Sequence, residues 1–129
     1  MKADLACSVI ERYAARFAET LTKIETEHTS AAARLRAYAG VYREALAGGE
    51  LVCLCVALSA GRDSLSEPVL AELNQFHVAS VAWLEQVFEA GRKDDAVNGI
   101  ADPAAEAAAT LALMEGAQLV ARAAKDITI

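Results

Sequence analysis

The side chains that could carry chemistry in this sequence are two histidines and three cysteines. His28 and His77 are the only groups that could serve as bases near neutral pH. Neither lies in ligand spacing with the other or with a cysteine, and the sequence contains no HExxH, GxSxG, GxGxxG or P-loop motif. We therefore expect no metal, no cofactor and no enzymatic activity. His77, on the inner side of an expected helix, could still offer one polar contact to a small apolar ligand.

The cysteine spacing does not indicate a disulfide framework. Cys53 and Cys55 lie two positions apart, which on a helix is about 200° of rotation, so their sulfur atoms point to opposite faces. A buried cysteine is most often a small apolar filler, and we favour that interpretation here. The alternative is a thiol that senses oxidants or electrophiles by forcing the core to repack.

Composition and charge favour one soluble, all-α domain over residues 1–129. The chain is 55% hydrophobic, rich in alanine and contains only two prolines, a balance that suits helix interiors. Its net charge of −6 argues against direct nucleic-acid binding, which needs clustered basic residues. No secretory signal or membrane-spanning segment is indicated, so we expect a cytoplasmic protein with no membrane partner.

The hydrophobic spacing predicts about five helices packed antiparallel to one another, over residues 4–27, 31–47, 51–60, 66–92 and 103–125. The segment 51–60 carries no charge, and its periodicity alone does not distinguish a buried strand from a buried helix. Its neighbours favour a short central helix. Thr29 or Ser30 can cap the second helix, and Asp102 precedes a first-turn proline in the last. In the first helix the predicted inward stripe consists of Leu5, Val9, Tyr13, Phe17, Leu21 and Ile24.

The residue patterns of two of these helices also predict which side chains are buried and which contact a second subunit. The fourth should bury Val69, Leu73, Phe76, Ser80, Leu84 and Val87, with Trp83 either packed or at a subunit contact. The last is apolar around most of its circumference, so one side should pack inward and the other against a second copy. The residues expected at this dimer interface are Leu113, Gly116, Ala117 and Val120. The alternative is an edge helix of a monomer.

The segments KADL at 2–5, ERYAARFAETL at 11–21 and ADPAAEAAATLALMEGAQLVARAAKD at 101–126 resemble the TetR/AcrR family of bacterial transcriptional regulators. The resemblance covers nearly the whole chain and is to the C-terminal domain that binds effectors and dimerises, in the LmrA/YxaF-like branch. The family's N-terminal helix-turn-helix has no counterpart in this sequence, and the chain stops where relatives continue into a short closing helix. We therefore expect no residue of this chain to contact DNA on the basis of the resemblance.

The resemblance implies the sensor domain of a transcriptional repressor, a homodimer that binds a small hydrophobic effector. We expect the effector between the first, third and fourth helices, where it would select one of two helix packings. The candidate ligand-binding residues are Phe17, Tyr42, Cys55, Phe76, His77 and Met114. A freestanding helical protein that dimerises with a full-length regulator is the alternative function, alongside the cysteine-based sensor.

Overall fold

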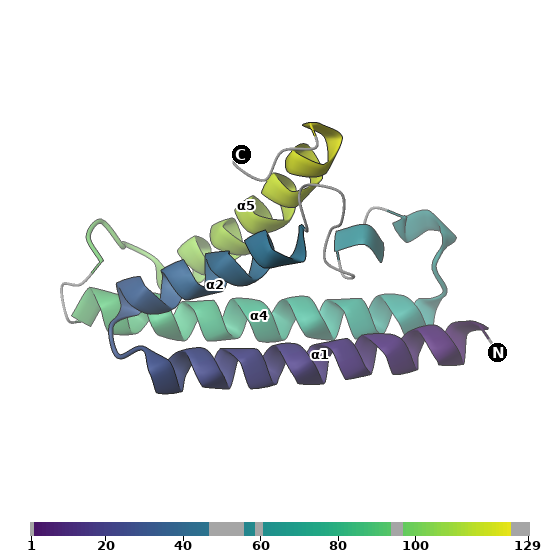
Figure 1. Cartoon of the computed structure of the whole chain (residues 1–129), viewed down its shortest axis with the longest axis horizontal. Coiled ribbons are helices and arrows are strands. Elements are labelled where there is room, and N and C mark those ends of the chain that lie inside the picture. The colour runs from purple at the N-terminus through teal and green to yellow at the C-terminus, as the bar shows by residue number, and fades with distance from the viewer. Residues whose placement is uncertain (1, 47–55, 59–60, 94–96, 125–129) are drawn as a thin grey trace.

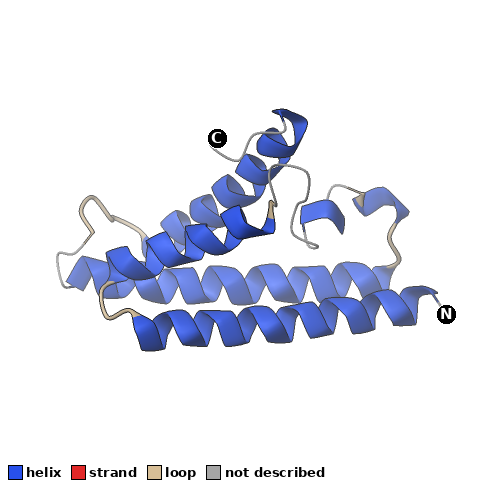
Figure 2. Ribbon diagram, viewed as in Figure 1, coloured by secondary structure: helices blue, strands red, loops and turns tan. Residues whose placement is uncertain are grey.

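The computed structural model describes residues 2–46, 56–58, 61–93 and 97–124, and this part of the chain is helical with no strand. The α-helices are α1 (Lys2–Glu27), α2 (Ala31–Ala45), α4 (Glu67–Lys93) and α5 (Pro103–Ala124), with a short 3-10 helix, η1 (Arg62–Ser64). The prediction of an all-α fold is confirmed (Figures 1 and 2). Of the expected central helix, only residues 56–58 are described; they are helical, and Val56 is buried.

The ends of the helices follow local capping chemistry. The Ser30 hydroxyl accepts a hydrogen bond from the Ala33 amide at 3.1 Å, so Ser30 caps α2. At α5, Oδ1 of Asp102 accepts from the amide of Ala104, also at 3.1 Å, and proline occupies the first helical position. Both helices therefore start where the sequence predicts.

The helix α4 lies at the centre of the structure and contacts α1, α2 and α5 (Figure 1). The described helices α1 and α2 run in opposite directions, as do α4 and α5, in agreement with the antiparallel packing expected (Figure 1). The helices α1 and α4 instead run side by side in the same direction (Figure 1). No described helix is long and apolar enough to cross a bilayer.

The core contains the predicted stripe of α4 but corrects the stripe of α1. All six predicted α4 positions are buried. In α1, Leu5 and Val9 are 68% and 45% exposed, whereas Ile10 is 1% exposed. The reason is geometric: steps of four residues overshoot each helical turn by about 40°, so three such steps rotate the stripe by about 120°. Phe17 and Leu21 face the core, and the positions that precede them by steps of four rotate away from it.

A glycine lets α4 pass close to its neighbours near its C-terminal end. A Cβ on Gly91 would lie 2.9 Å from the Cβ of Ala31 and 2.9 Å from Cγ2 of Val97. Both distances are shorter than ordinary carbon contacts. Only glycine allows α4, the start of α2 and the segment after α4 to meet here.

Candidate functional site

The centre of the molecule is an aromatic cluster contributed by α1, α2 and α4. Phe17 lies at the middle of this cluster and contacts rings from both other helices. Its ring centroid lies 5.1 Å from that of Phe76 and 6.2 Å from that of Tyr42, with the rings edge to face. Tyr38 stacks on Trp83 at 5.6 Å. Such pairs add about 0.5–1.5 kcal/mol each beyond the area they bury. The cluster consists of Tyr13, Phe17, Tyr38, Tyr42, Phe76 and Trp83.

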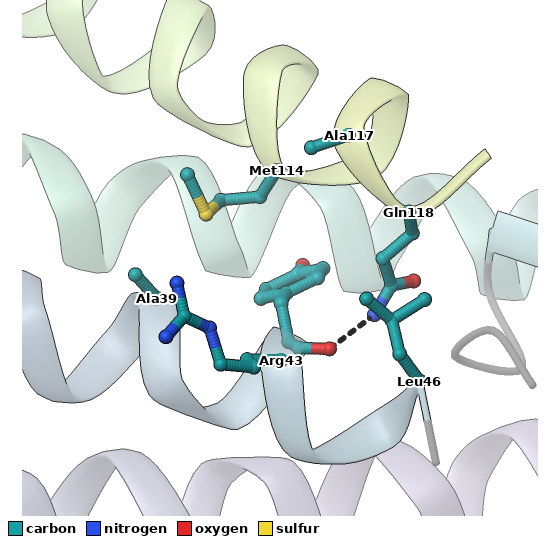
Figure 3. Close-up of a pocket in the computed structure, with 7 residues that line it drawn as sticks. Ala39, Arg43, Leu46, Met114, Ala117 and Gln118 are labelled. Carbon is teal, nitrogen blue, oxygen red and sulfur yellow. Dashed lines mark hydrogen bonds between the residues drawn. The ribbon is translucent and has the colours of Figure 1, made fainter. Parts of the chain in front are cut away.

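One groove lies between α2 and α5, on the Tyr42 side of this cluster. Figure 3 shows Met114 extending from α5 into the space above α2, and Ala117 lines the same groove from α5. The groove measures about 100 Å³, well below the roughly 300–1,000 Å³ of small-molecule pockets. Its lining residues are Ala39, Tyr42, Arg43, Leu46, Met114, Ala117 and Gln118.

A buried hydrogen bond closes one end of this groove. Nε2 of Gln118, a residue only 1% exposed, donates to the carbonyl oxygen of Tyr42 at 2.8 Å (Figure 3). At the end of α2, the amide of Leu46 turns back to the carbonyl of Arg43 instead of that of Tyr42. Gln118 therefore supplies a donor to a carbonyl in the last turn of α2, where helices leave acceptors unsatisfied. The bond ties α5 to α2.

A second groove, of about 230 Å³, lies between α1 and α4. Phe17 and Phe76 form part of its wall, so the same two rings separate it from the interior. Its lining residues are Ala14, Phe17, Ala18, Leu21, Glu72, Gln75, Phe76, Ala79 and Ser80.

The candidate ligand residues therefore do not share one cavity. Phe17 and Phe76 line the α1–α4 groove, while Tyr42 and Met114 line the α2–α5 groove. His77 lines neither of them, and Cys55 lies outside the described residues. The edge-to-face contact of Phe17 with Tyr42 connects the two sides.

His77 faces α5 and pairs with a carboxylate there. Its Nε2 lies 3.2 Å from Oε2 of Glu115, and neither atom has another hydrogen-bond partner within the described part of the chain. The contact with Glu115 raises the pKa of His77 above its ordinary value, although partial burial opposes this effect. The pair is an electrostatic link between α4 and α5. Among the described residues no cluster of His, Cys, Asp and Glu could hold a metal ion.

Two polar contacts of the core do not follow from the sequence pattern. Nε1 of Trp83 donates to Oε1 of Glu25 at 2.6 Å, joining α4 to the end of α1. The Gln118 bond joins residues 76 positions apart. Spacing within one helix carries no signal for either contact, because each depends on how two helices are aligned.

Solved structures with this arrangement include TetR-type regulators. A TetR-family regulator from Agrobacterium tumefaciens has a TM-score of 0.91 and 26% identity, over 98% of this chain and 67% of its own. The regulatory protein TetR from Rhodobacter sphaeroides has a TM-score of 0.88 and 26% identity, over 97% of this chain and 68% of its own. The chain has the TetR-family fold. Reduced NemR from E. coli also matches, with a TM-score of 0.84 and 27% identity, over 98% of this chain and 66% of its own.

This chain spans about two thirds of the length of each of these TetR-type structures. No protein-family model and no curated protein matches the sequence. The similarity therefore rests on the course of the helices together with about one identical residue in four.

Within the TetR-type fold, one side of α5 is uncovered, and this outer apolar face is defined here by Leu113, Gly116 and Val120, which lie three to seven residues apart on that helix. Leu113 and Val120 are 64% and 53% exposed. Gly116 is half-buried, and no atom lies within 4 Å of the place a Cβ would occupy. Ala117, also expected at the dimer interface, lines the α2–α5 groove.

Proposed function

We propose that this chain is the effector-sensing and dimerising part of a TetR-type transcriptional repressor. The observation that carries the proposal is the match of 97–98% of the chain to TetR-type regulators at TM-scores of 0.84–0.91. The outer apolar face of α5 supports a homodimer, because isolated domains rarely leave large apolar side chains exposed on one side of a helix. We assign the chain no catalytic role, no cofactor and no direct contact with nucleic acid, and we place it in the bacterial cytoplasm.

We place the effector between α2 and α5, against Tyr42 and Met114. The groove is lined mainly by apolar groups and carries the guanidinium of Arg43, which suits a small hydrophobic ligand with a polar end. Its volume of about 100 Å³ is too small for most such ligands. Binding must therefore separate the two helices, and this movement stretches or breaks the Gln118–Tyr42 hydrogen bond.

This requirement links binding to a conformational change. A ligand shifts an equilibrium only by the difference between its affinities for two states. A closed state with the hydrogen bond and an open state with the ligand differ in the distance between α2 and α5. In a dimer joined through α5, that difference alters how the two subunits are placed, which is the usual output of such a switch.

The first experiment measures the mass of the purified chain in solution by light scattering, with native mass spectrometry to detect any small molecule that copurifies. We expect a dimer of about 27 kDa, which is 2 × 13.6 kDa. Val120→Glu places a charge on the outer apolar face and should yield the 13.6 kDa monomer. Val9→Glu is the matched control, since Val9 is similarly exposed but lies on α1, and it should leave the dimer intact.

The measured mass shows whether the chain dimerises through the outer apolar face. A monomer at all concentrations, or a dimer unchanged by Val120→Glu, would contradict dimerisation through this face. A copurified ligand whose retention depends on Met114 would support the effector site. Retention of a ligand by a Met114→Arg variant with an unchanged affinity would place the effector elsewhere.

A further inference from the structure

His77 of α4 and Glu115 of α5 face each other in a contact that neither the α2–α5 groove nor the outer apolar face uses. Their facing atoms, Nε2 and Oε2, lie 3.2 Å apart, and both atoms are buried. The two side chains remain 27% and 18% exposed, so His77 can still exchange its proton with solvent. The strength of this contact depends on that proton, because only the imidazolium carries a charge that attracts the carboxylate.

Glu115 sets the electrostatic environment of His77. Hydrogen bonding to Glu115 is the largest influence on the pKa of His77 and raises it, burial lowers it, and the negative charge of Glu115 raises it further. The helices α1 and α2 also pack against α4, but among the described residues neither supplies a charged group that shifts this pKa. On α4 itself, Glu85 lies on the same open surface as His77, about two turns away, and does not shift it either.

Glu115 also lies beside the residues that close the α2–α5 groove. It follows Met114, which lines the groove, and precedes Gln118 by three residues, which is about 4.5 Å along the helix axis (Figure 3). About 100° of rotation separates neighbouring positions, so Met114 faces α2 while Glu115 faces α4. Because α5 is one continuous helix, a shift away from α2 at Gln118 also displaces Glu115 relative to His77.

We propose that the contact between His77 and Glu115 is a proton-dependent clamp on α5. It holds the α2–α5 groove closed when His77 is protonated and releases it when His77 loses its proton. This inference rests on the proposed function for the role of the groove, and it adds protons as a second input to the effector switch. An effector that needs the open groove then binds more tightly at higher pH.

The direction of the effect follows from linkage. In the closed groove the contact raises the pKa of His77, and in the open groove, with Glu115 displaced, the pKa returns toward its ordinary value of about 6.5. The closed state therefore binds the proton more tightly. Opening is hardest below about pH 6.5 and becomes easier as the pH rises through the raised pKa. A partly exposed ion pair changes such an equilibrium by about threefold.

The test follows the methyl group of Met114 in the ligand-free chain. The sequence contains only two methionines, Met1 and Met114, so ¹³C-methyl labelling of methionine gives a single signal from the groove. Relaxation dispersion of this signal measures the population of the open state on the microsecond-to-millisecond timescale. We expect that population to rise about threefold between pH 6 and pH 8. The ring signals of His77 should titrate over the same range.

Two variants locate the effect. Glu115→Gln keeps the size of the side chain but removes its charge, so it should abolish the dependence on pH. Glu85→Gln is the matched control, because it removes a carboxylate from the same open surface that is not paired with His77, and it should retain the threefold change. Each comparison is repeated in a Gln118→Leu background, where loss of the hydrogen bond to Tyr42 favours the open state.

An open population that is equal at pH 6 and pH 8, or a pH dependence that survives Glu115→Gln, would overturn the proposal. So would the absence of any exchange at Met114 in the Gln118→Leu background, because the groove then does not open. A monomeric chain, or a dimer unaffected by Val120→Glu, would contradict the proposed function without changing the pH response of Met114. The two proposals therefore fail on different measurements.

Discussion

Replacing Gln118 with leucine tests the hydrogen bond that joins α5 to α2. Leucine has a similar volume, so the change removes the amide without opening a large cavity. The carbonyl of Tyr42 then loses the buried hydrogen bond from Gln118, which costs about 1–3 kcal/mol. At about 2.1 cal/mol/K per residue, the unfolding entropy of 129 residues is about 0.27 kcal/mol/K. A loss of about 2 kcal/mol therefore lowers Tm by about 7 °C.

The assay is urea and thermal unfolding followed by circular dichroism, at one protein concentration because a dimer unfolds in a concentration-dependent way. Gln86→Leu is the control: Gln86 is exposed on α4, and its replacement should change stability by less than about 0.5 kcal/mol. Gln118→Glu sharpens the test. The carboxylate faces a carbonyl, so this variant should be weakest at neutral pH and recover as acid protonates it.

A Gln118→Leu variant as stable as the wild type would contradict the reasoning. So would a Gln118→Glu variant with the same unfolding free energy at pH 4 and pH 7, relative to the wild type. Either result would mean that the carbonyl of Tyr42 finds another donor without cost.

Three further changes test the packing of α4. Gly91→Ala should cost about 1–3 kcal/mol in urea unfolding, because its Cβ would lie within 3 Å of carbons in α2 and in the segment after α4. Glu25→Gln should lower the unfolding free energy by about 1 kcal/mol, because the hydrogen bond from Trp83 loses its charged acceptor, and the tryptophan fluorescence should change with it. The raised pKa of His77 gives stability that is complete below its unfolded pKa of about 6.5 and is lost as pH rises through the folded pKa, so Glu115→Gln should remove this decline between pH 6 and 8.

The sequence predicts the helices well because their determinants are local. Capping side chains such as Ser30 and Asp102 act on amides two or three positions away, and the apolar period of α4 holds over its whole length. The stripe of α1 was predicted wrongly at Leu5 and Val9, because a spacing of four residues only approximates the helical repeat.

The site is harder to predict because it depends on contacts between helices. Phe76 and His77 are adjacent in sequence, yet about 100° of rotation separates them, so one lies on the α1–α4 groove and the other faces α5. The sequence pattern alone predicts that both line one pocket. The roles of Tyr38 and Gln118 have no local signal, since they depend on which residues of α4 and α2 are brought opposite them.

Under the proposed function, α5 serves two sites on opposite sides of one rigid element. Gln118 points inward to α2, while Leu113 and Val120 belong to the outer apolar face. A helix of 22 residues moves as a unit when its hydrogen bonds stay intact, so α5 cannot yield to an effector at Gln118 without carrying Val120 with it. A stable dimer that fixes Val120 in turn resists opening of the α2–α5 groove. By linkage, effector binding and dimerisation must then influence each other to the same extent, whichever of the two is measured.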